Sequence, residues 1–345
     1  MPSIAPHYQA SGLMSDSATF HFQYQSARLM HGLVVGRAGL DLYPQPDHCK
    51  IRDALSFSSD LGGSAGNIAV AMARAGGKVG LISGVSRDAV GDFVRGRLHQ
   101  AGVSTDLVIE TEANERTSLA LAEVRDDDCE VVIYRNDPAD LQVRCTEAVK
   151  AAIENSHNLV VTGTNLIDVQ SRSETIAMMQ HAKQHDCKVW LDLDYRRWNW
   201  PSLETTRQAY GEAARFTDVL VGNEDEFSVL SDDLTQQIAL CNQNQQVVLL
   251  KKGQGGSILY APDATLESGI YPVKALKPYG AGDAFLGNLI IHYMENGDWI
   301  PGIQAGSAAA AIVVAERGCA SAMPGRSMLQ DFMQQHAMTP QASWR

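Results

Sequence analysis

The residues best suited to chemistry are an aspartate and the three small residues before it, Gly280, Ala281, Gly282 and Asp283. They open a segment of helical character that runs to about residue 296. Small residues let the backbone approach a ligand, and the free amides of a first helical turn bind anions. Beside such an anion hole, Asp283 could be the base that activates a hydroxyl for phosphoryl transfer. It could equally well stabilise the start of the helix, and the local residues do not decide between the two roles.

A second glycine-rich segment, residues 60–69, also leads into a helical pattern. It is not a P-loop, because no Gly-Lys-Ser/Thr follows, and it lacks the G-x-G-x-x-G spacing of dinucleotide sites. Gly62 and Gly63 permit a tight turn, and Asn67 on the first helical turn could bond a ligand hydroxyl. By itself, the segment is explained as well by a tight helix start.

Short apolar runs separated by helix-length segments must position these two turns. The runs are residues 31–36, 79–83, 159–163, 188–192, 218–222 and 246–251. Their alternation with helices predicts an α/β fold with a mainly parallel central sheet covered on both faces. Residues 171–174 have capping-box spacing and predict the start of a helix. Residues 303–336 are helical in character, with a break at Gly318 and Pro324.

Residues 117–124 and 129–134 break this rhythm, because they resemble two strands joined by a charged turn. A hairpin inside an α/β chain is a candidate lid or oligomer edge, and its exposed edge is the ground for expecting a possible homodimer. Residues 1–30 are aperiodic and predict a partly ordered tail before a single domain at 31–340.

The composition narrows the class of protein. With a net charge of −12, the chain is a poor match for a broad nucleic-acid surface, which needs clustered Lys and Arg. Six scattered cysteines without a C-x-x-C pair favour a reducing compartment over a disulfide framework or a zinc site. The longest apolar run, 308–315, is too short to span a bilayer, and no secretory signal opens the chain. We therefore expect a cytoplasmic protein that binds neither nucleic acid nor membrane. His31 and His181 show no metal-ligand spacing, so core packing or surface placement is expected for them.

In order and separation, the two glycine-rich segments resemble the two signatures of the ribokinase-like (PfkB) carbohydrate kinases. The likeness extends from about residue 33 to 324. It implies a ribokinase-like three-layer α/β/α fold with a small β lid, formed by segments at about 41–60 and 105–140. It also implies a kinase that uses ATP and Mg²⁺ to phosphorylate a hydroxyl of a sugar or sugar acid. Longer runs resemble the sugar-acid kinases of the family more specifically: residues 36–43, 134–140, 161–164, 191–196 and 316–324.

The resemblance implies a role for each matching residue. Asp283 matches the family's base, and Gly280, Ala281 and Gly282 match its anion hole. The implied substrate-binding residues are Asp41, Gly62, Gly63 and Asn67. The implied nucleotide-binding residues are Asn223, Glu226, Lys251, Gly253, Gly255 and Ser307, with Ser307 in place of the family's usual asparagine. Glu226 would organise Mg²⁺ indirectly, through water, although Asn223 and Glu226 could instead simply cap a helix.

Two arginines and a lysine bear on the substrate and on cations. Arg135 would lie at the end of the hairpin and Arg196 at the carboxyl end of a strand, where ligands of α/β sheets bind. Because a guanidinium matches a carboxylate, both indicate a sugar-acid substrate, with a surface ion pair as the alternative for each. Lys277 stands where many family members have an acidic residue of a monovalent-cation site. This lysine could replace the cation, abolish the site or point to solvent, so K⁺ activation is not predicted.

Other functions remain open. The acceptor could be 2-keto-3-deoxygluconate, fructose or ribose, or the chain could be a catalytically weak family member that binds a sugar or nucleotide.

Overall fold

The computed structural model describes residues 28–112, 114–125 and 129–345. Most of the expected tail, residues 1–27, and the hairpin-turn residues 126–128 lie outside the described residues.

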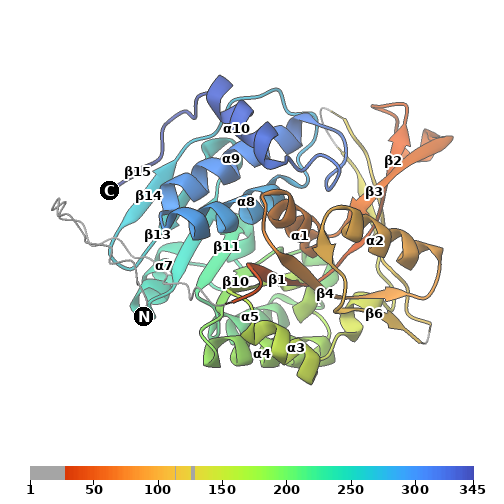
Figure 1. Ribbon diagram of the computed structural model, residues 1–345, viewed down its shortest axis with the longest axis horizontal. Coiled ribbons are helices and arrows are strands. Elements are labelled where there is room, and N and C mark those ends of the chain that lie inside the picture. Colours follow the sequence, from red (N-terminus) through yellow and green to blue (C-terminus); the bar gives the residue numbers. More distant parts are fainter. Residues whose placement is uncertain (1–27, 113, 126–128) are drawn as a thin grey trace, which may run out of the picture.

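A large, mainly parallel sheet forms the centre of the molecule (Figure 1). Its strands lie in the order β15-β14-β13-β12-β11-β10-β9-β1-β4-β5, with β6 also paired to β4. The parallel strands are β1 (Gly32–Val35), β4 (Val79–Ser86), β5 (Val103–Ser104), β6 (Val108–Thr111), β9 (Asn158–Thr162), β10 (Lys188–Asp192), β11 (Val219–Asn223) and β12 (Val247–Lys251). The antiparallel strands at one edge are β13 (Ser257–Tyr260), β14 (Thr265–Ser268) and β15 (Ser343–Trp344).

Helices cover both faces of this sheet, and each face has its own apolar core. One layer contains α1 (Ser64–Arg74), α2 (Ala89–Gln100), α8 (Ala281–Asn296), α9 (Trp299–Ala315) and α10 (Arg326–Gln335). The other contains α3 (Glu147–Glu154), α4 (Val169–Gln184), α5 (Leu203–Ala214), α6 (Glu224–Phe227) and α7 (Leu234–Gln243). The short 3₁₀ turns are η1 (Ile51–Asp53), η2 (Ala139–Gln142), η3 (Gly163–Leu166), η4 (Arg197–Asn199) and η5 (Gly253–Gly255). Strands such as β1 and β9 are buried along their whole length, as expected for a sheet covered on both faces, and the predicted α/β fold is confirmed.

A second, smaller sheet projects from one side of the molecule (Figure 1). It consists of β2 (Gly39–Gln45), β3 (Ser56–Gly62), β7 (Leu119–Ala122) and β8 (Val131–Tyr134), in the order β3-β2-β7-β8. The antiparallel pairing of β7 with β8 confirms the predicted hairpin. Residues 108–111, at the start of the expected second lid segment, pair with β4 in the large sheet instead.

The capping box predicted at residues 171–174 is wrong. Helix α4 starts two residues earlier, at Val169, because the side chain of Asp168 accepts hydrogen bonds from the amides of Gln170 and Ser171 at 2.9 Å. The hydroxyl of Ser171 donates to the carbonyl of Asn165 instead. The predicted helical C-terminal region is confirmed as α9 and α10, with a non-helical break between them.

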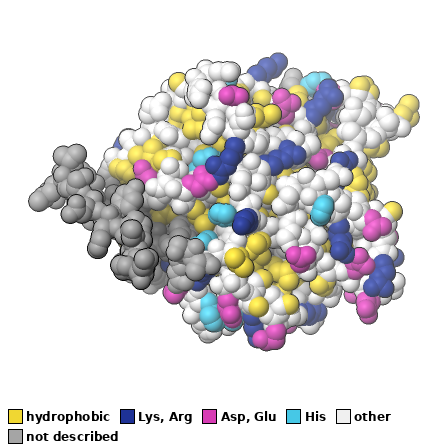
Figure 2. Space-filling view, viewed as in Figure 1, with side chains coloured by type: hydrophobic (Ala, Val, Ile, Leu, Met, Phe, Trp, Pro, Cys, Tyr) yellow, Lys and Arg dark blue, Asp and Glu magenta, His cyan; other side chains and the backbone are white. Residues whose placement is uncertain are grey.

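Acidic and basic side chains are interspersed over the face seen in Figure 2. Within the part of the chain that the structure describes, no helix has the length and apolar character needed to cross a membrane.

Close packing of α1 against α8 brings the two glycine-rich segments together. Gly287 of α8 lies so near α1 that a Cβ atom there would be 2.5 Å from the Cβ of Ala71 and 2.9 Å from the carbonyl oxygen of Ile68. A side chain at this position must push the two helices apart.

We predict that Gly287→Ala lowers the free energy of unfolding by about 1–3 kcal/mol, because the added methyl group overpacks this helix contact. Chemical denaturation of the variant measures the loss. Gly96→Ala on the exposed side of α2, where an added Cβ meets nothing within 4 Å, is the matched control. It should stabilise by about 0.5–1 kcal/mol through helix propensity. Equal effects of the two substitutions would contradict the packing argument.

Candidate active site

Asp283 lies where the first turn of α8 meets the first turn of α1. Its Oδ1 accepts a hydrogen bond from Ser64 Oγ at 2.9 Å, and its Oδ2 accepts one from Asn67 Nδ2 at 2.9 Å. Gly280, the N-cap of α8, has a φ of +81°, in the left-handed region that favours glycine. The carboxylate is therefore held by the other helix, while the first amides of α8 stay available for an anion.

The surroundings of Asp283 suit a base. Burial raises the pKa of its carboxyl group, and the nearby charge of Asp194 raises it further. The hydrogen bonds from Asn67 and Ser64, and the charge of Lys251, act in the opposite direction. A carboxylate with a raised pKa takes up a proton more readily than one in water.

A lysine from the central sheet supplies positive charge beside the anion-binding turn. Lys251 ends β12, and its Nζ lies 3.0 Å from Asp192 Oδ1 and 4.0 Å from Glu226 Oε2. A Cβ on Gly282 would be only 3.2 Å from this Nζ. Although burial acts to lower the pKa of Lys251, the two carboxylates outweigh it and raise the pKa above its ordinary value. The ammonium group therefore stays charged next to residues 280–282.

An arginine links Glu226 of this cluster to a further carboxylate, Asp194, which lies shortly after β10. Arg196 Nη2 lies 2.8 Å from Asp194 Oδ1, and its Nη1 lies 3.6 Å from Glu226 Oε1. Burial raises the pKa of Asp192 to about 7 against the pull of Lys251. Asp194 has a φ of +36°, which is uncommon for a non-glycine residue and is typical of functional sites.

Asn223 and Glu226 cap a helix and join this cluster at the same time. Asn223 Oδ1 accepts from the amide of Glu226 at 2.8 Å, and Glu226 Oε2 accepts from the amide of Asn223 at 2.9 Å, which forms a capping box. The cap aims the carboxylate of Glu226 at Lys251 and Arg196. The helix-capping and nucleotide-binding interpretations of this pair are therefore compatible.

The remaining residues predicted to bind the nucleotide lie in η5 and in α9. Gly253 and Gly255 form the turn η5 directly after Lys251, and Gly253 has a φ of +55°. Ser307 is buried in α9, which packs along α8.

Asp41, on the small sheet, has one carboxylate oxygen prepared for a ligand. Its Oδ2 accepts from the hydroxyl of Tyr43 at 3.3 Å, but its buried Oδ1 has no hydrogen-bond partner among the described residues. Asn67 Oδ1 is likewise buried and unpaired within that part of the chain. A Cβ on Gly62 would lie 1.8 Å from Asp41 Oδ1, so glycine is needed there. Unpaired buried acceptors are costly, and a ligand that brings hydroxyl donors relieves the cost.

The backbone at position 63 also requires glycine. Its φ is +90°, and a Cβ there would lie 2.4 Å from the carbonyl oxygen of Arg37. Glycine is therefore required where α1 begins against the segment that leads to Asp41.

The two arginines predicted to bind substrate are both engaged in ion pairs. Arg135, with a side chain only 8% exposed, is paired with the buried carboxylate of Asp140, and both of its Nη atoms lie 3.2 Å from the carbonyl oxygen of Thr164. Arg196 is paired with Asp194 and Glu226.

Sequence reasoning missed a third arginine, Arg37. Its Nη1 donates to Ser118 Oγ at 3.3 Å, and no carboxylate of the described residues lies within ion-pair distance of it. Its charge nevertheless acts on Asp41, where it opposes the effect of burial on the pKa. The signal was present in the sequence, because Arg37 stands four residues before Asp41 in the segment 36–43.

Lys277 does not point to solvent. Its side chain is 2% exposed, and its Nζ donates to the carbonyl oxygens of Tyr279 at 2.9 Å and Val313 at 3.0 Å. Burial lowers its pKa, while electrostatic interactions with nearby groups, including Cys319 and Asp60, act to raise it. Lys277 thus ties the residues before Gly280 to the end of α9.

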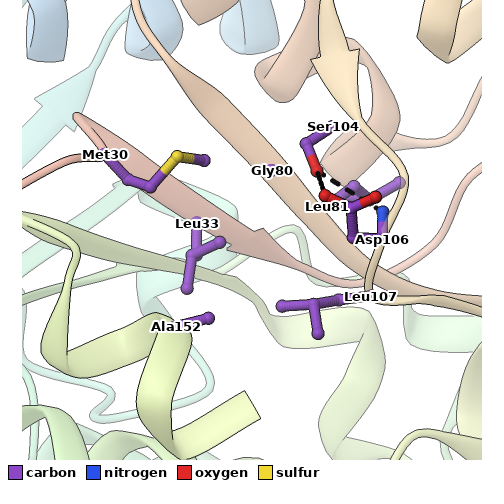
Figure 3. A pocket seen from close by; sticks show the side chains of 8 residues that line it. All are labelled: Met30, Leu33, Gly80, Leu81, Ser104, Asp106, Leu107 and Ala152. Atoms are coloured by element: carbon purple, nitrogen blue, oxygen red, sulfur yellow. Dashed lines mark hydrogen bonds between the residues drawn. The ribbon is translucent and has the colours of Figure 1, made fainter. Parts of the chain in front are cut away.

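An apolar cavity of about 180 Å³ lies elsewhere, between β1, β4 and α3 (Figure 3). Met30, Leu33 and Leu107 line it, and its polar pair is Ser104 with Asp106, at 2.8 Å. Among the described residues, this lining has no lysine or arginine side chain, unlike the cluster beside Asp283.

Asp41 should make stability depend on pH. Burial raises the pKa of its carboxyl group to about 6, well above the ordinary value for an aspartate. Because the folded state holds this proton more tightly than the unfolded chain, wild type loses the associated stability as pH rises from about 4 through about 6. The free energy of unfolding of Asp41→Asn lacks this loss. We therefore predict that the difference in unfolding free energy between Asp41→Asn and wild type shifts by about 1–3 kcal/mol in favour of the variant from about pH 4 to about pH 8.

Chemical denaturation at both pH values gives this difference. Asp53→Asn is the control, since the side chain of Asp53 is 64% exposed, and it should follow wild type at both pH values. A constant difference between Asp41→Asn and wild type would show that burial does not raise the pKa of Asp41.

Comparison with known proteins agrees with this geometry. A family model described as "pfkB family carbohydrate kinase" matches residues 32–326. A 5-dehydro-2-deoxygluconokinase of Photobacterium profundum is 39% identical over 319 residues, covering 90% of this chain and 96% of the relative. A 5-dehydro-2-deoxygluconokinase of Geobacillus kaustophilus is 33% identical over 315 residues, covering 88% and 93%.

Solved structures share the fold. A fructokinase with bound ATP from Xylella fastidiosa superimposes with a TM-score of 0.78 at 25% identity, covering 89% of this chain and 99% of that one. An aminoimidazole riboside kinase from Salmonella enterica gives a TM-score of 0.72 at 19% identity, covering 88% and 99%. With the family model spanning most of its length and a relative at 39% identity, the chain belongs to the PfkB family of carbohydrate kinases.

Proposed function

We propose that this PfkB kinase transfers the γ-phosphoryl group of ATP to a hydroxyl of 5-dehydro-2-deoxy-D-gluconate, a keto sugar acid. The observation that carries the proposal is Asp283, held by Ser64 and Asn67 at the anion-binding start of α8. The names of the relatives that match over most of this chain support the acceptor.

In this proposal the γ-phosphate lies over the amides of residues 280–282, and Asp283 takes the proton of the attacking hydroxyl. Lys251, beside Gly282, balances negative charge on the transferring group. The carboxylates of Asp192, Asp194 and Glu226 are oxygen donors of the kind that Mg²⁺ prefers. Glu226 is already bonded to the amide of Asn223 and faces two cations, which suits contact with a metal through water. When bound, Mg²⁺ would neutralise phosphate charge.

The sugar acid would lie between the two glycine-rich segments, and its carboxylate would bind Arg37. Asp41 Oδ1 and Asn67 Oδ1 are unpaired acceptors in the described part of the chain, and they suit sugar hydroxyls. Arg37 has no carboxylate partner there and lies close enough to Asp41 to act on its charge. Compared with Arg135 and Arg196, which are already paired, Arg37 is the better candidate for the substrate carboxylate.

We also propose that the small sheet acts as a lid over the sugar and that its exposed edge strand, β8, supports a homodimer. Val131 and Tyr134 on β8 are 42% and 58% exposed. A lid excludes water and so protects ATP from hydrolysis.

The cysteines are free thiols, which supports the proposed cytoplasmic location.

Asp283→Asn should lower kcat by about 10²–10⁴-fold, because an amide cannot accept the hydroxyl proton. Nucleotide affinity, measured by calorimetry, should stay near wild type, since the amides of residues 280–282 are unchanged. Acceptor-dependent ADP release measures turnover.

Asp298→Asn is the matched control, because Asp298 also sits at a helix start, where it accepts from the amide of Ile300. This control should change stability without a comparable loss of kcat. Near-normal kcat in Asp283→Asn would exclude Asp283 as the base.

Arg37→Met should raise KM for the keto sugar acid by about 10- to 100-fold, through loss of a charge-assisted hydrogen bond of about 1.5–3 kcal/mol. Turnover of neutral sugars such as fructose should change little. Arg37→Lys should recover part of the affinity, because it keeps the charge but not the planar fork.

Equal losses on acidic and neutral acceptors would refute carboxylate binding by Arg37. Wild-type activity confined to neutral sugars would refute the acceptor itself, while the role of Asp283 would stand.

A further inference from the structure

Three potential metal ligands meet on the layer of helices opposite to the one that holds Asp283. They are Glu154, the last residue of α3, and His181 and His185, which lie in the last turn and at the C-cap of α4. One ligand atom from each lies within 4.8 Å of the others. The helices α3 and α4 cover the lower face of the sheet in Figure 1, whereas α8 covers the upper face.

The spacing between His181 and His185 suits a metal, although no metal-ligand spacing was expected at His181. His181 and His185 are four residues apart, so their rings share one side of a helix and their centroids lie 4.2 Å apart. The third ligand comes from a different helix and is 27 residues away from His181 along the chain. Only the packing of α3 on α4 brings it near.

The geometry prepares one ring nitrogen, Nε2 of His185, for a metal, and places His181 Nε2 where a metal could replace its proton. His181 Nε2 lies 3.0 Å from Glu154 Oε1, and His185 Nε2 lies 3.7 Å from the same oxygen. His185 Nδ1 lies 2.9 Å from the carbonyl oxygen of His181 and donates a hydrogen bond to it. Because that bond places the proton on Nδ1, the Nε2 of neutral His185 keeps a free lone pair directed at the cluster.

We propose that Glu154, His181 and His185 form a Zn²⁺ site with three protein ligands, completed by water. Two imidazoles and one carboxylate are a donor set that suits zinc and neighbouring transition metals, whereas Mg²⁺ and Ca²⁺ prefer oxygen donors alone. Zinc lies about 2.0–2.2 Å from such ligands, so the three side chains must adjust their positions when it binds. The side chains of His185 and Glu154 are 41% and 45% exposed, which leaves them room to rotate.

Some neighbouring charges favour the binding of a cation at this site, and others oppose it. The carboxylate of Glu147, one side of an ion pair with Lys150, interacts electrostatically with His181. Arg28 donates to the carbonyl oxygen of His185 and adds positive charge nearby. Because these two effects oppose each other, the affinity for a cation depends mainly on the three direct ligands. By binding only where α3 and α4 are packed together, zinc should stabilise the folded state.

Isothermal titration of EDTA-stripped, tag-free protein with ZnCl₂, together with thermal unfolding, tests the proposal. Wild type should bind one Zn²⁺ per chain at this site and show a rise in Tm with added zinc. His181→Ala should abolish that binding event, and Glu154→Gln should weaken it by at least about 10-fold. Both variants should lose most of the zinc-dependent rise in Tm.

His336→Ala is the matched control. His336 also caps the end of a helix and has its Nδ1 3.0 Å from the carbonyl oxygen four residues earlier, but it belongs to no ligand cluster among the described residues. This variant should bind zinc as wild type does. Equal zinc affinity and equal stabilisation in wild type and His181→Ala would overturn the proposal, and would instead indicate binding by thiols or by scattered surface groups.

Discussion

The hydrogen bonds of one carboxylate organise the active site of this kinase. Asp283 bonds to Ser64 and Asn67, which lie 219 and 216 residues away along the chain. These bonds require α1 and α8 to start at the same point, and Gly287 lets the two helices approach closely enough to do so. The two glycine-rich segments therefore face each other, and Asp283, the proposed base, lies between them.

The second constraint is the balance of charge around that point. Buried carboxylates are costly unless cations compensate them. Lys251 and Arg196 supply this compensation for Asp192, Asp194 and Glu226, and Lys251 also lies beside Gly282. The positive charge that offsets the cost of burying these carboxylates thus also suits the site to a polyphosphate.

The small sheet is fixed at its base and exposed at its far end. Asp60, at the inner end of β3, accepts hydrogen bonds from the amides of Cys319 and Ser321 and from the hydroxyl of Ser321. Toward the other end of β3 the side chains are exposed, as at Phe57. A sheet held at one end and open at the other is suited to closing over a substrate while Asp41 stays in register.

Local sequence patterns determined the alternation of buried strands and helices, the hairpin at β7 and β8, and the two glycine-rich turns. Each of these features depends on neighbours along the chain: hydrophobic periodicity, turn geometry and the freedom of glycine. The start of α4 was misplaced because Asp168, the residue that caps this helix, stood just outside the pattern considered.

Only the tertiary structure decided which charges meet. It paired Arg135 with Asp140, left Arg37 without a carboxylate among the described residues, buried Lys277 against two carbonyl oxygens, and joined Glu154 to the histidines of α4. An electrostatic interaction depends on distance through space and on burial. Neither can be read from separation along the chain, and the sequence alone therefore singled out Asp283 but not Arg37, which has no carboxylate partner among the described residues.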